Sequence, residues 1–170
     1  MKRLLYAALL AALGLASAAP ARAAAGATTL APVLGAHDWI NGRATTSTTR
    51  GKVVIVDVFT FDCINCKHVT PELKKLHAAL PAAQLEVVGV HAPETPFERD
   101  RTNVVAELAR QGIVWPVAVD NGFAIWNAYG TTAWPTQFIF DKHGNLRKTV
   151  VGEGYDDEVE ATVKALISEP

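Results

Sequence analysis

The sequence predicts an α/β fold with a mostly parallel central sheet and helices on both of its faces. The first reason is that β-branched apolar runs at residues 52–59 and 85–91 alternate with amphipathic segments, in which apolar residues recur at three- and four-residue steps. Strands that alternate with helices form largely parallel sheets. The second reason lies near the C-terminus, where apolar runs at 135–141 and 146–151 flank the turn sequence DKHGN and predict a β-hairpin.

The other elements follow in chain order. The first strand is interrupted only by Asp57, which indicates burial on both faces. A helix follows from Cys63 to Leu80, and after the second strand come a helix that ends at Gly112, a short strand in VWPVAVD and a short helix in GFAIWNAYG. A helix over residues 156–168 closes the chain. The faces expected to cover the sheet consist of Val69, Leu73, Leu76 and Leu80 in the first helix and Val159, Val163, Leu166 and Ile167 in the last.

The N-terminus has the layout of a secretory signal peptide. A basic start (MKR), an apolar run rich in Ala and Leu, and the small residues Ala21 and Ala23 predict cleavage after residue 23. An uncleaved membrane anchor is the alternative. We therefore expect a signal peptide over residues 1–23, a flexible tether over residues 24–35 and a single domain over residues 36–170, exported to a bacterial periplasm.

The composition narrows the classes of function. The formal net charge is −1 over 170 residues, and no basic face predicts binding to nucleic acid or to a membrane surface. Cys63 and Cys66 are the only cysteines, and a disulfide between residues three apart removes little entropy from the unfolded chain. The pair is therefore expected to serve chemistry rather than stability.

Three kinds of site use a C-x-x-C pair: zinc sites, haem attachment sites and redox sites. A structural zinc site needs four protein ligands, and His68 is expected to point away from the pair while His91 and His143 are expected at the surface. Haem attachment requires C-x-x-C-H, but Lys67 follows Cys66. A C-x-x-C at the first strand-to-helix junction is typical of a redox pair.

This junction gives the two cysteines different expected roles. Cys63 begins the helix, where free backbone N–H groups and the positive end of the helix dipole favour its thiolate. Cys66, one turn later, is covered by the helix, so Cys63 is expected to attack the substrate and Cys66 to resolve the mixed disulfide. Asp57 is expected to be buried with a raised pKa and to take the proton from Cys66. A carboxylate bonded locally to the backbone at a strand edge is the alternative.

Together these residues resemble the thioredoxin superfamily. An extra helix and strand at roughly residues 97–118 resemble its exported TlpA/ResA-like branch. The segments FTFDCINC, VVGVHAPETPFERDRTNV and IWNAYGTTAWPTQFIFD are similar to the thioredoxin-like C-terminal domain of DipZ-type membrane proteins. The residues that match the buried acid, the cysteine pair, the helix-kinking proline and the cis-proline of the superfamily are Asp57, Cys63, Cys66, Pro71 and Pro135.

The resemblance implies a thioredoxin-like fold with the inserted helix–strand unit and a redox-active disulfide, without another cofactor or a metal. It implies a cis peptide between Trp134 and Pro135, two residues that would contact an extended protein substrate beside Cys63. A core aromatic is the alternative for Trp134. The implied partners are protein thiol or disulfide substrates and a membrane electron donor of the DsbD/CcdA type, and we expect a monomer.

The sequence departs from the superfamily at three places. Asp62 places a carboxylate beside the nucleophile, which opposes thiolate formation. Val69 stands where ResA-type reductases have a glutamate, which weakens a role in haem-protein assembly. The dipeptide Ile64–Asn65 tunes the redox potential in a direction that the sequence does not give. The direction of electron flow, the substrates and the redox partner therefore stay open.

The expected function is that of a periplasmic thiol:disulfide oxidoreductase acting on protein substrates as a reductase. One alternative is a peroxiredoxin-type thiol peroxidase, because Thr60 lies three residues before Cys63, although Val56 replaces the proline of that motif. The other alternative is a non-catalytic copper chaperone or adaptor, because soft thiolates suit Cu(I), although Met1 is the only methionine.

Overall fold

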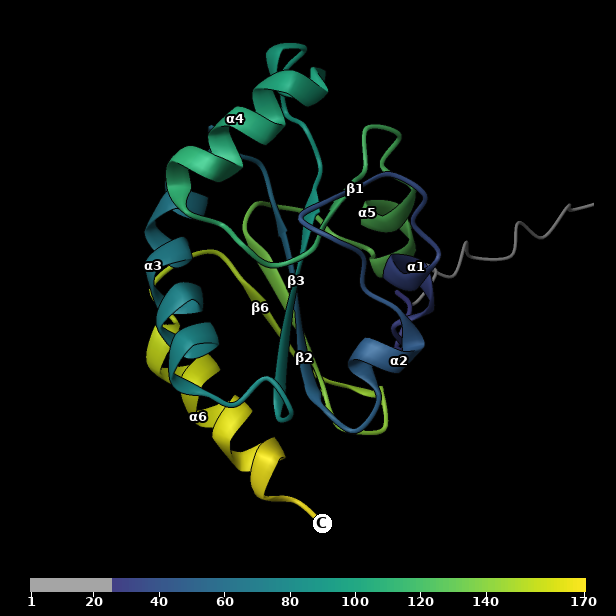
Figure 1. Cartoon of the computed structure of the whole chain (residues 1–170), viewed down its shortest axis with the longest axis vertical. Helices are drawn as coiled ribbons and strands as arrows, with labels where there is room; N and C mark the ends of the chain where they lie inside the picture. Colours follow the sequence, from purple (N-terminus) through teal and green to yellow (C-terminus); the bar gives the residue numbers. More distant parts are fainter. Residues whose placement is uncertain (1–25) are drawn as a thin grey trace, which may run out of the picture.

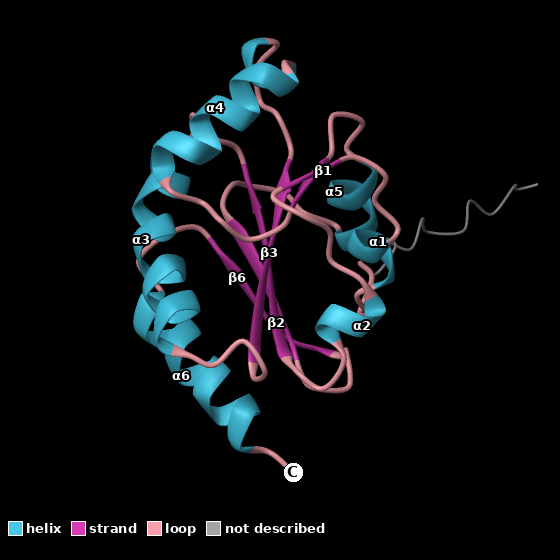
Figure 2. Cartoon of the chain, viewed as in Figure 1, coloured by secondary structure: helices cyan, strands magenta, loops and turns pink. Residues whose placement is uncertain are grey.

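A mixed six-stranded sheet forms the centre of the protein, which the computed structural model describes from residue 26 to residue 170 (Figures 1 and 2). The strands lie in the order β1–β4–β3–β2–β5–β6. Their bounds are Trp39–Ile40 (β1), Val53–Phe59 (β2), Leu85–His91 (β3), Val117–Val119 (β4), Thr136–Phe140 (β5) and Leu146–Val151 (β6). The predicted signal peptide over residues 1–23 lies outside the described residues.

The sheet is parallel only at its centre. Strands β2, β3 and β4 pair in parallel, whereas β5 pairs antiparallel with β2, β6 with β5, and β1 with β4. The expected α/β fold and the C-terminal hairpin are confirmed, but the parallel part is smaller than expected. The reason is the length of the connection before β5. The helix α5 (Ala124–Tyr129) has six residues and spans only about 9 Å, too little to return the chain to the opposite end of the sheet.

Helices cover both faces of the sheet, as expected. In Figure 2, α3, α4 and α6 lie on one side of the strands, and α1, α2 and α5 lie on the other. Besides α5, the bounds are Ala31–Leu34 (α1), Thr46–Thr49 (α2), Ile64–Ala79 (α3), Arg101–Gln111 (α4) and Asp156–Ser168 (α6), with a 3₁₀ turn, η1, over Phe97–Arg99. The predicted apolar faces are confirmed by the buried residues Val69, Leu73 and Leu76 of α3 and Val159, Val163 and Leu166 of α6.

The two sides of β2 belong to two different hydrophobic cores. Val53, Ile55 and Phe59 pack in the core that contains the buried residues of α3 and α6. The residues between them, Val54, Val56 and Val58, pack in the core under α1 and α5. Because side chains alternate between the faces of a strand, Asp57 lies on the α3 side. The strand therefore places its one carboxylate on the face that α3 covers.

The inserted helix–strand unit is present between β3 and α5. It consists of η1, α4 and β4, and β4 supplies the pairing partner of both β3 and β1. Figure 1 shows α4 beyond the end of the sheet that leads into α3. The unit therefore adds structure next to the turn where the two cysteines lie.

The N-terminal segment is packed on the domain, so the expected flexible tether is wrong for residues 26–35. Val33 of α1 is fully buried, and Leu30 is 8% exposed. The backbone N–H of Ala27 donates to the carbonyl of Ala128 at 2.7 Å. The sequence did not predict these contacts, because the partner residues lie about 100 positions away. Within residues 26–170, no helix is long and apolar enough to cross a membrane.

Candidate active site

The two cysteines lie at the turn that connects β2 to α3. Cys63 is the N-cap residue of α3, with φ −66° and ψ 123°, and its Sγ accepts a hydrogen bond from the backbone N–H of Cys66 at 3.4 Å. Both cysteines are free thiols. Cys63 is half-buried, whereas Cys66 is only 3% exposed. The more accessible sulfur is thus the one at the helix N-terminus, where the backbone N–H groups stabilise negative charge.

Cys66 is held in its protonated form. Burial raises the pKa of the Cys66 thiol, and the hydrogen bond with Cys63 and the charge of Asp57 act in the same direction. A backbone hydrogen bond from Thr60 acts in the opposite direction but does not outweigh them. Cys66 can therefore attack only after a base has taken its proton.

Asp57 is the candidate base for Cys66, because it is the buried carboxyl group among residues 26–170 whose pKa lies near 7. Its side chain is 5% exposed, and its Oδ1 has no hydrogen-bond partner among residues 26–170. Burial raises the pKa of Asp57 from 3.8 to about 7. The expectation of a buried carboxyl with a raised pKa agrees with this geometry, and a locally bonded carboxylate does not. Near neutral pH the group exchanges a proton readily, as a general base must.

Trp134 and Pro135 precede β5, next to the end of β2. The peptide between them is cis, as the resemblance implied. Trp134 is half-buried, and its Nε1 donates to the carbonyl of Ala92 at 2.9 Å. Its ring centroid lies 4.4 Å from that of Trp126. Trp134 is thus anchored in the fold, which agrees with the core-aromatic alternative, and it packs on the same core cluster as Cys63. Its contact with a substrate stays a prediction.

Asp62, the acid beside the nucleophile, is paired with a lysine. Its Oδ1 lies 2.8 Å from Nζ of Lys67, in the first turns of α3. The hydrogen bond and the charge of Lys67 lower the pKa of Asp62, with a smaller contribution from Arg110. Since both side chains reach solvent, screening keeps the pair weak. In the sequence, Lys67 served only to exclude haem attachment, because it is not histidine. Its position five residues after Asp62 was the signal that could have predicted the ion pair.

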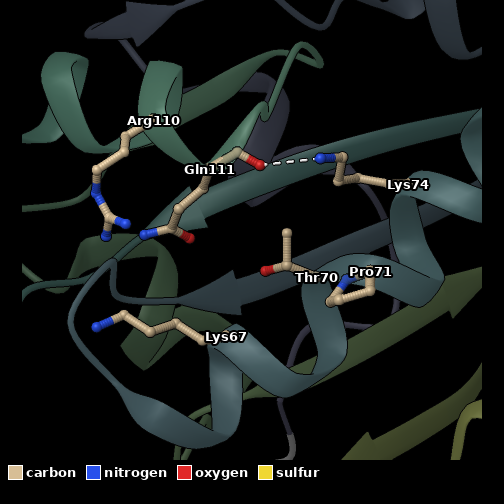
Figure 3. A pocket seen from close by; sticks show the side chains of 6 residues that line it. All are labelled: Lys67, Thr70, Pro71, Lys74, Arg110 and Gln111. Atoms are coloured by element: carbon tan, nitrogen blue, oxygen red, sulfur yellow. Dashed lines mark hydrogen bonds between the residues drawn. The ribbon is translucent and has the colours of Figure 1, made fainter.

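Lys67 also connects the site to a pocket between α3 and α4. The pocket has a volume of about 420 Å³ and is lined by Lys67, Thr70, Pro71, Lys74, Arg110 and Gln111. Figure 3 shows the charged ends of Lys67 and Arg110 on the same side of it, while Nζ of Lys74 donates to the carbonyl of Gln111 at 3.1 Å. Neither cysteine lines this pocket, so it is a neighbour of the candidate site and not its centre.

The pairing of Asp62 leads to a prediction about the nucleophile. We expect Asp62→Asn to speed the alkylation of Cys63 by about two- to fivefold at low salt, because a negative charge near the sulfur is removed. Lys67→Met should slow it by a similar factor, since Asp62 then loses its partner. The measurement is the rate of iodoacetamide alkylation at low and high salt. Lys75→Met is the control, because Lys75 pairs with Glu72 and Glu160 instead. Equal rates in all four proteins at low salt would contradict the prediction.

His91 is not at the surface, which corrects the expectation from the sequence. Its side chain is fully buried, and its ring stacks on Phe61 with the centroids 5.4 Å apart. Burial lowers the pKa of His91 to about 4, so the ring is neutral at neutral pH. Nearby, Glu98 of η1 bonds to the hydroxyl of Thr60, which lies 3.3 Å from Nε2 of His91. The sequence signal for His91 was its position at the end of a strand in which only Glu86 is charged, and Glu98 had no such signal.

The other two histidines that the sequence offered as zinc ligands lie at the surface. His143 is exposed, as expected, and His68 is exposed and pairs with Glu153. In the part of the chain that the structure describes, no group of three or more His, Cys, Asp or Glu side chains could hold a metal ion. The two cysteines therefore have no further protein ligand there.

The chain matches known proteins along most of its described length. Residues 27–149 match the family model described as the AhpC/TSA family. Protein DipZ of Mycobacterium bovis and of Mycobacterium tuberculosis is 37% identical over 120 residues, which are 71% of this chain but 17% of DipZ. The chain therefore spans about a sixth of that relative.

Two further matches are closer to this chain in length. The thiol-disulfide oxidoreductase YkuV of Bacillus subtilis is 27% identical over 136 residues, covering 79% of this chain and 91% of YkuV. The crystal structure of a thiol-disulfide isomerase from Corynebacterium glutamicum has a TM-score of 0.73 and 27% identity, covering 81% of this chain and 95% of the other.

These matches agree with the fold and with the resemblance seen in the sequence. Strands β1 to β5, the cysteines at the start of α3 and the inserted unit lie within the matched residues, whereas β6 ends just after them and α6 follows them. The chain belongs to the AhpC/TSA family of the thioredoxin superfamily, in its TlpA/ResA-like branch.

Proposed function

We propose that this protein is a periplasmic thiol:disulfide oxidoreductase that reduces disulfides of protein substrates through Cys63 and Cys66. The observation that supports this function most strongly is the unequal environment of the two sulfurs. Cys63 is accessible at the N-terminus of α3, whereas Cys66 is buried and protonated beside a carboxyl group whose pKa is about 7. Such a pair suits one attacking and one resolving thiol.

The reaction begins at Cys63. Its thiolate attacks one sulfur of the substrate disulfide, the substrate S–S bond breaks, and the other substrate sulfur leaves as a thiolate. The Asp57 carboxylate takes the proton from Cys66, and the Cys66 thiolate attacks Sγ of Cys63. The second substrate thiolate leaves, and a Cys63–Cys66 disulfide remains. Two electrons have then passed from the dithiol to the substrate.

The environment of Cys63 supports the proposed direction of electron flow. Strongly oxidising pairs owe their potential to a well-stabilised reduced thiolate. Here Asp62, although paired with Lys67, still places a carboxylate beside Cys63. This arrangement does not favour an unusually stable thiolate, which supports a reductase. Because the periplasm is oxidising, such a reductase needs electrons from a membrane donor of the DsbD/CcdA type.

Trp134 and Pro135 complete the proposed site. Both lie immediately before β5, next to the end of the strand that leads to Cys63. We assign them to contact with an extended segment of the substrate around its disulfide. The peroxidase alternative has less support, because Thr60, the residue that suggested it, is fully buried and its hydroxyl bonds to Glu98.

The test is a redox titration of the mature protein combined with an exchange assay. The purified protein is equilibrated with glutathione buffers and its thiols are counted, which gives the potential of the pair. Reduction of insulin disulfides is then compared between the wild type and Cys63→Ala. A wild type that exchanges no disulfide but binds Cu(I) tightly would replace this proposal with the copper-binding alternative.

A further inference from the structure

Glu98 is the least exposed of the acidic residues among residues 26–170, with an exposure of 1%. It lies in η1, within the inserted unit, and it takes no part in the reaction described above. One oxygen, Oε2, accepts the backbone N–H groups of Glu94 at 2.9 Å and Thr95 at 2.6 Å. The other, Oε1, accepts the hydroxyl of Thr60 and the backbone N–H of Asp62 at 3.4 Å. One carboxylate therefore connects two separate loops.

The second of these loops leads directly to the cysteines. The carbonyl of Thr60 accepts the backbone N–H of Cys63 at 3.4 Å. Glu98 is thus linked through Thr60 to the backbone of Cys63, although it does not touch the sulfur.

The contacts of Glu98 suit a fixed negative charge. Burial would raise the pKa of Glu98, but hydrogen bonds from Thr60, Thr95 and Asp62 outweigh it, and the pKa lies below its ordinary value. His91, the ring next to Thr60, is neutral at neutral pH because burial lowers its pKa to about 4. The charge of Glu98 is therefore met by N–H and hydroxyl donors, which have a defined direction, and not by a cation.

We propose that Glu98 is a positioning residue, whose carboxylate fixes the segment from Thr60 to Asp62 and thereby holds Cys63 at the N-terminus of α3. The reaction that Glu98 serves rests on the proposed function. The hydrogen bonds that hold the segment before Cys63 are independent of it. The inserted unit then has a chemical purpose, because it delivers this carboxylate to the turn before the nucleophile.

The variants change the acceptor, Glu98, and the donor, Thr60, separately. Glu98→Gln keeps the size of the side chain but turns one acceptor oxygen into a donor that faces N–H groups, and we expect the alkylation of Cys63 to slow by about tenfold. Thr60→Val keeps the shape and removes the hydroxyl, so it should slow alkylation as well. Thr60→Ser should recover most of the rate that Thr60→Val loses. The double variant should be no slower than the slower single variant, because both remove the same link.

Asp141→Asn is the matched control. Asp141 is another buried carboxylate, 6% exposed, whose Oδ1 accepts the backbone N–H groups of His143 at 2.9 Å and Asn145 at 3.0 Å. It follows β5 at the opposite end of the sheet from Cys63, because Phe140 pairs with Val54 at the start of β2. Its loss should lower stability in urea without changing the rate or the pH profile of Cys63 alkylation.

The measurement is the pH profile of iodoacetamide alkylation of Cys63, followed by mass spectrometry on the reduced protein. This reaction needs only a thiol, so it reports on Glu98 even if the protein exchanges no disulfide and the proposed function fails. A folded Glu98→Gln protein with the wild-type profile would overturn the proposal. So would effects of Glu98→Gln and Thr60→Val that multiply. If Glu98→Gln does not fold, equal rates in Thr60→Val and Thr60→Ser overturn it instead.

Discussion

The Cys66→Ala variant is expected to accumulate a mixed disulfide between Cys63 and its substrate, whereas the Cys63→Ala variant forms none. The reason is that the accessible sulfur attacks first and the buried sulfur releases the product. Attack by Cys66 occurs within one molecule, where effective concentrations are very high. Its loss should therefore slow turnover by about 10³-fold or more.

The trapped species can be measured directly. A substrate with one disulfide is mixed with each variant, and adducts are counted by mass spectrometry under non-reducing conditions and again after reduction. The Cys63→Ala/Cys66→Ala double variant gives the background. Adducts of equal yield on both single variants would show that the two sulfurs do not have separate roles.

The Asp57→Asn variant is expected to gain stability relative to the wild type as the pH rises. The pKa of Asp57 is 3.8 unfolded and about 7 folded, so the neutral carboxyl stabilises the fold fully below about pH 4. This contribution is lost as the pH rises towards 7, by about 4 kcal/mol in total, because the buried group must ionise. Asparagine does not ionise, so the variant keeps its stability over that range.

Urea unfolding of both reduced proteins between pH 4 and pH 8 measures this difference. The buried His91 acts in the opposite direction, because its lowered pKa makes stability fall as the pH falls from about 6.5 to about 4. His91 is present in both proteins, so its contribution cancels in the comparison. If the difference in unfolding free energy between Asp57→Asn and the wild type does not change with pH, the assigned ionisation of Asp57 is wrong.

The same substitution should slow the resolving step. General bases contribute about 10²- to 10⁴-fold to such steps, so Asp57→Asn should slow release from the mixed disulfide by about 10²-fold near neutral pH. The wild-type rate should rise through about pH 7 as Asp57 becomes ionised. Stopped-flow measurement of resolution, with the fold checked by circular dichroism, tests both statements. An unchanged rate across this pH range would exclude the role of Asp57 as base.

The parts of the site that the sequence revealed are those encoded by short-range spacing. The C-x-x-C pair at a strand-to-helix junction and the single carboxylate in an apolar strand are local patterns, and each has a direct physical meaning. Cys63 and Asp57 lie where these patterns place them. The cis peptide before Pro135 came from the resemblance, because a sequence alone does not distinguish the isomers.

The parts that the sequence did not reveal depend on long-range contacts. Glu98 is a charged residue in the polar segment TPFERDRTN, and only the folding of η1 against the loop before Cys63 buries it. His91 is also buried by a long-range contact, since the inserted unit covers the end of its strand. The tether predicted over residues 24–35 is wrong for residues 26–35 for a similar reason, because the partner residues of this segment are distant in the sequence.

The two outer strands of the sheet bear on how the protein behaves at high concentration. An unpaired strand edge can pair with another molecule and start aggregation. At one side, β1 has only two residues and offers little to a partner. At the other side, Arg147 and Lys148 of β6 form ion pairs with Glu169 and Glu158, and the backbone N–H of Leu146 already donates to the carbonyl of Thr28 at 2.9 Å. The packed N-terminal segment thus covers the first residue of the outer strand β6 and leaves less of that edge free to pair with another molecule.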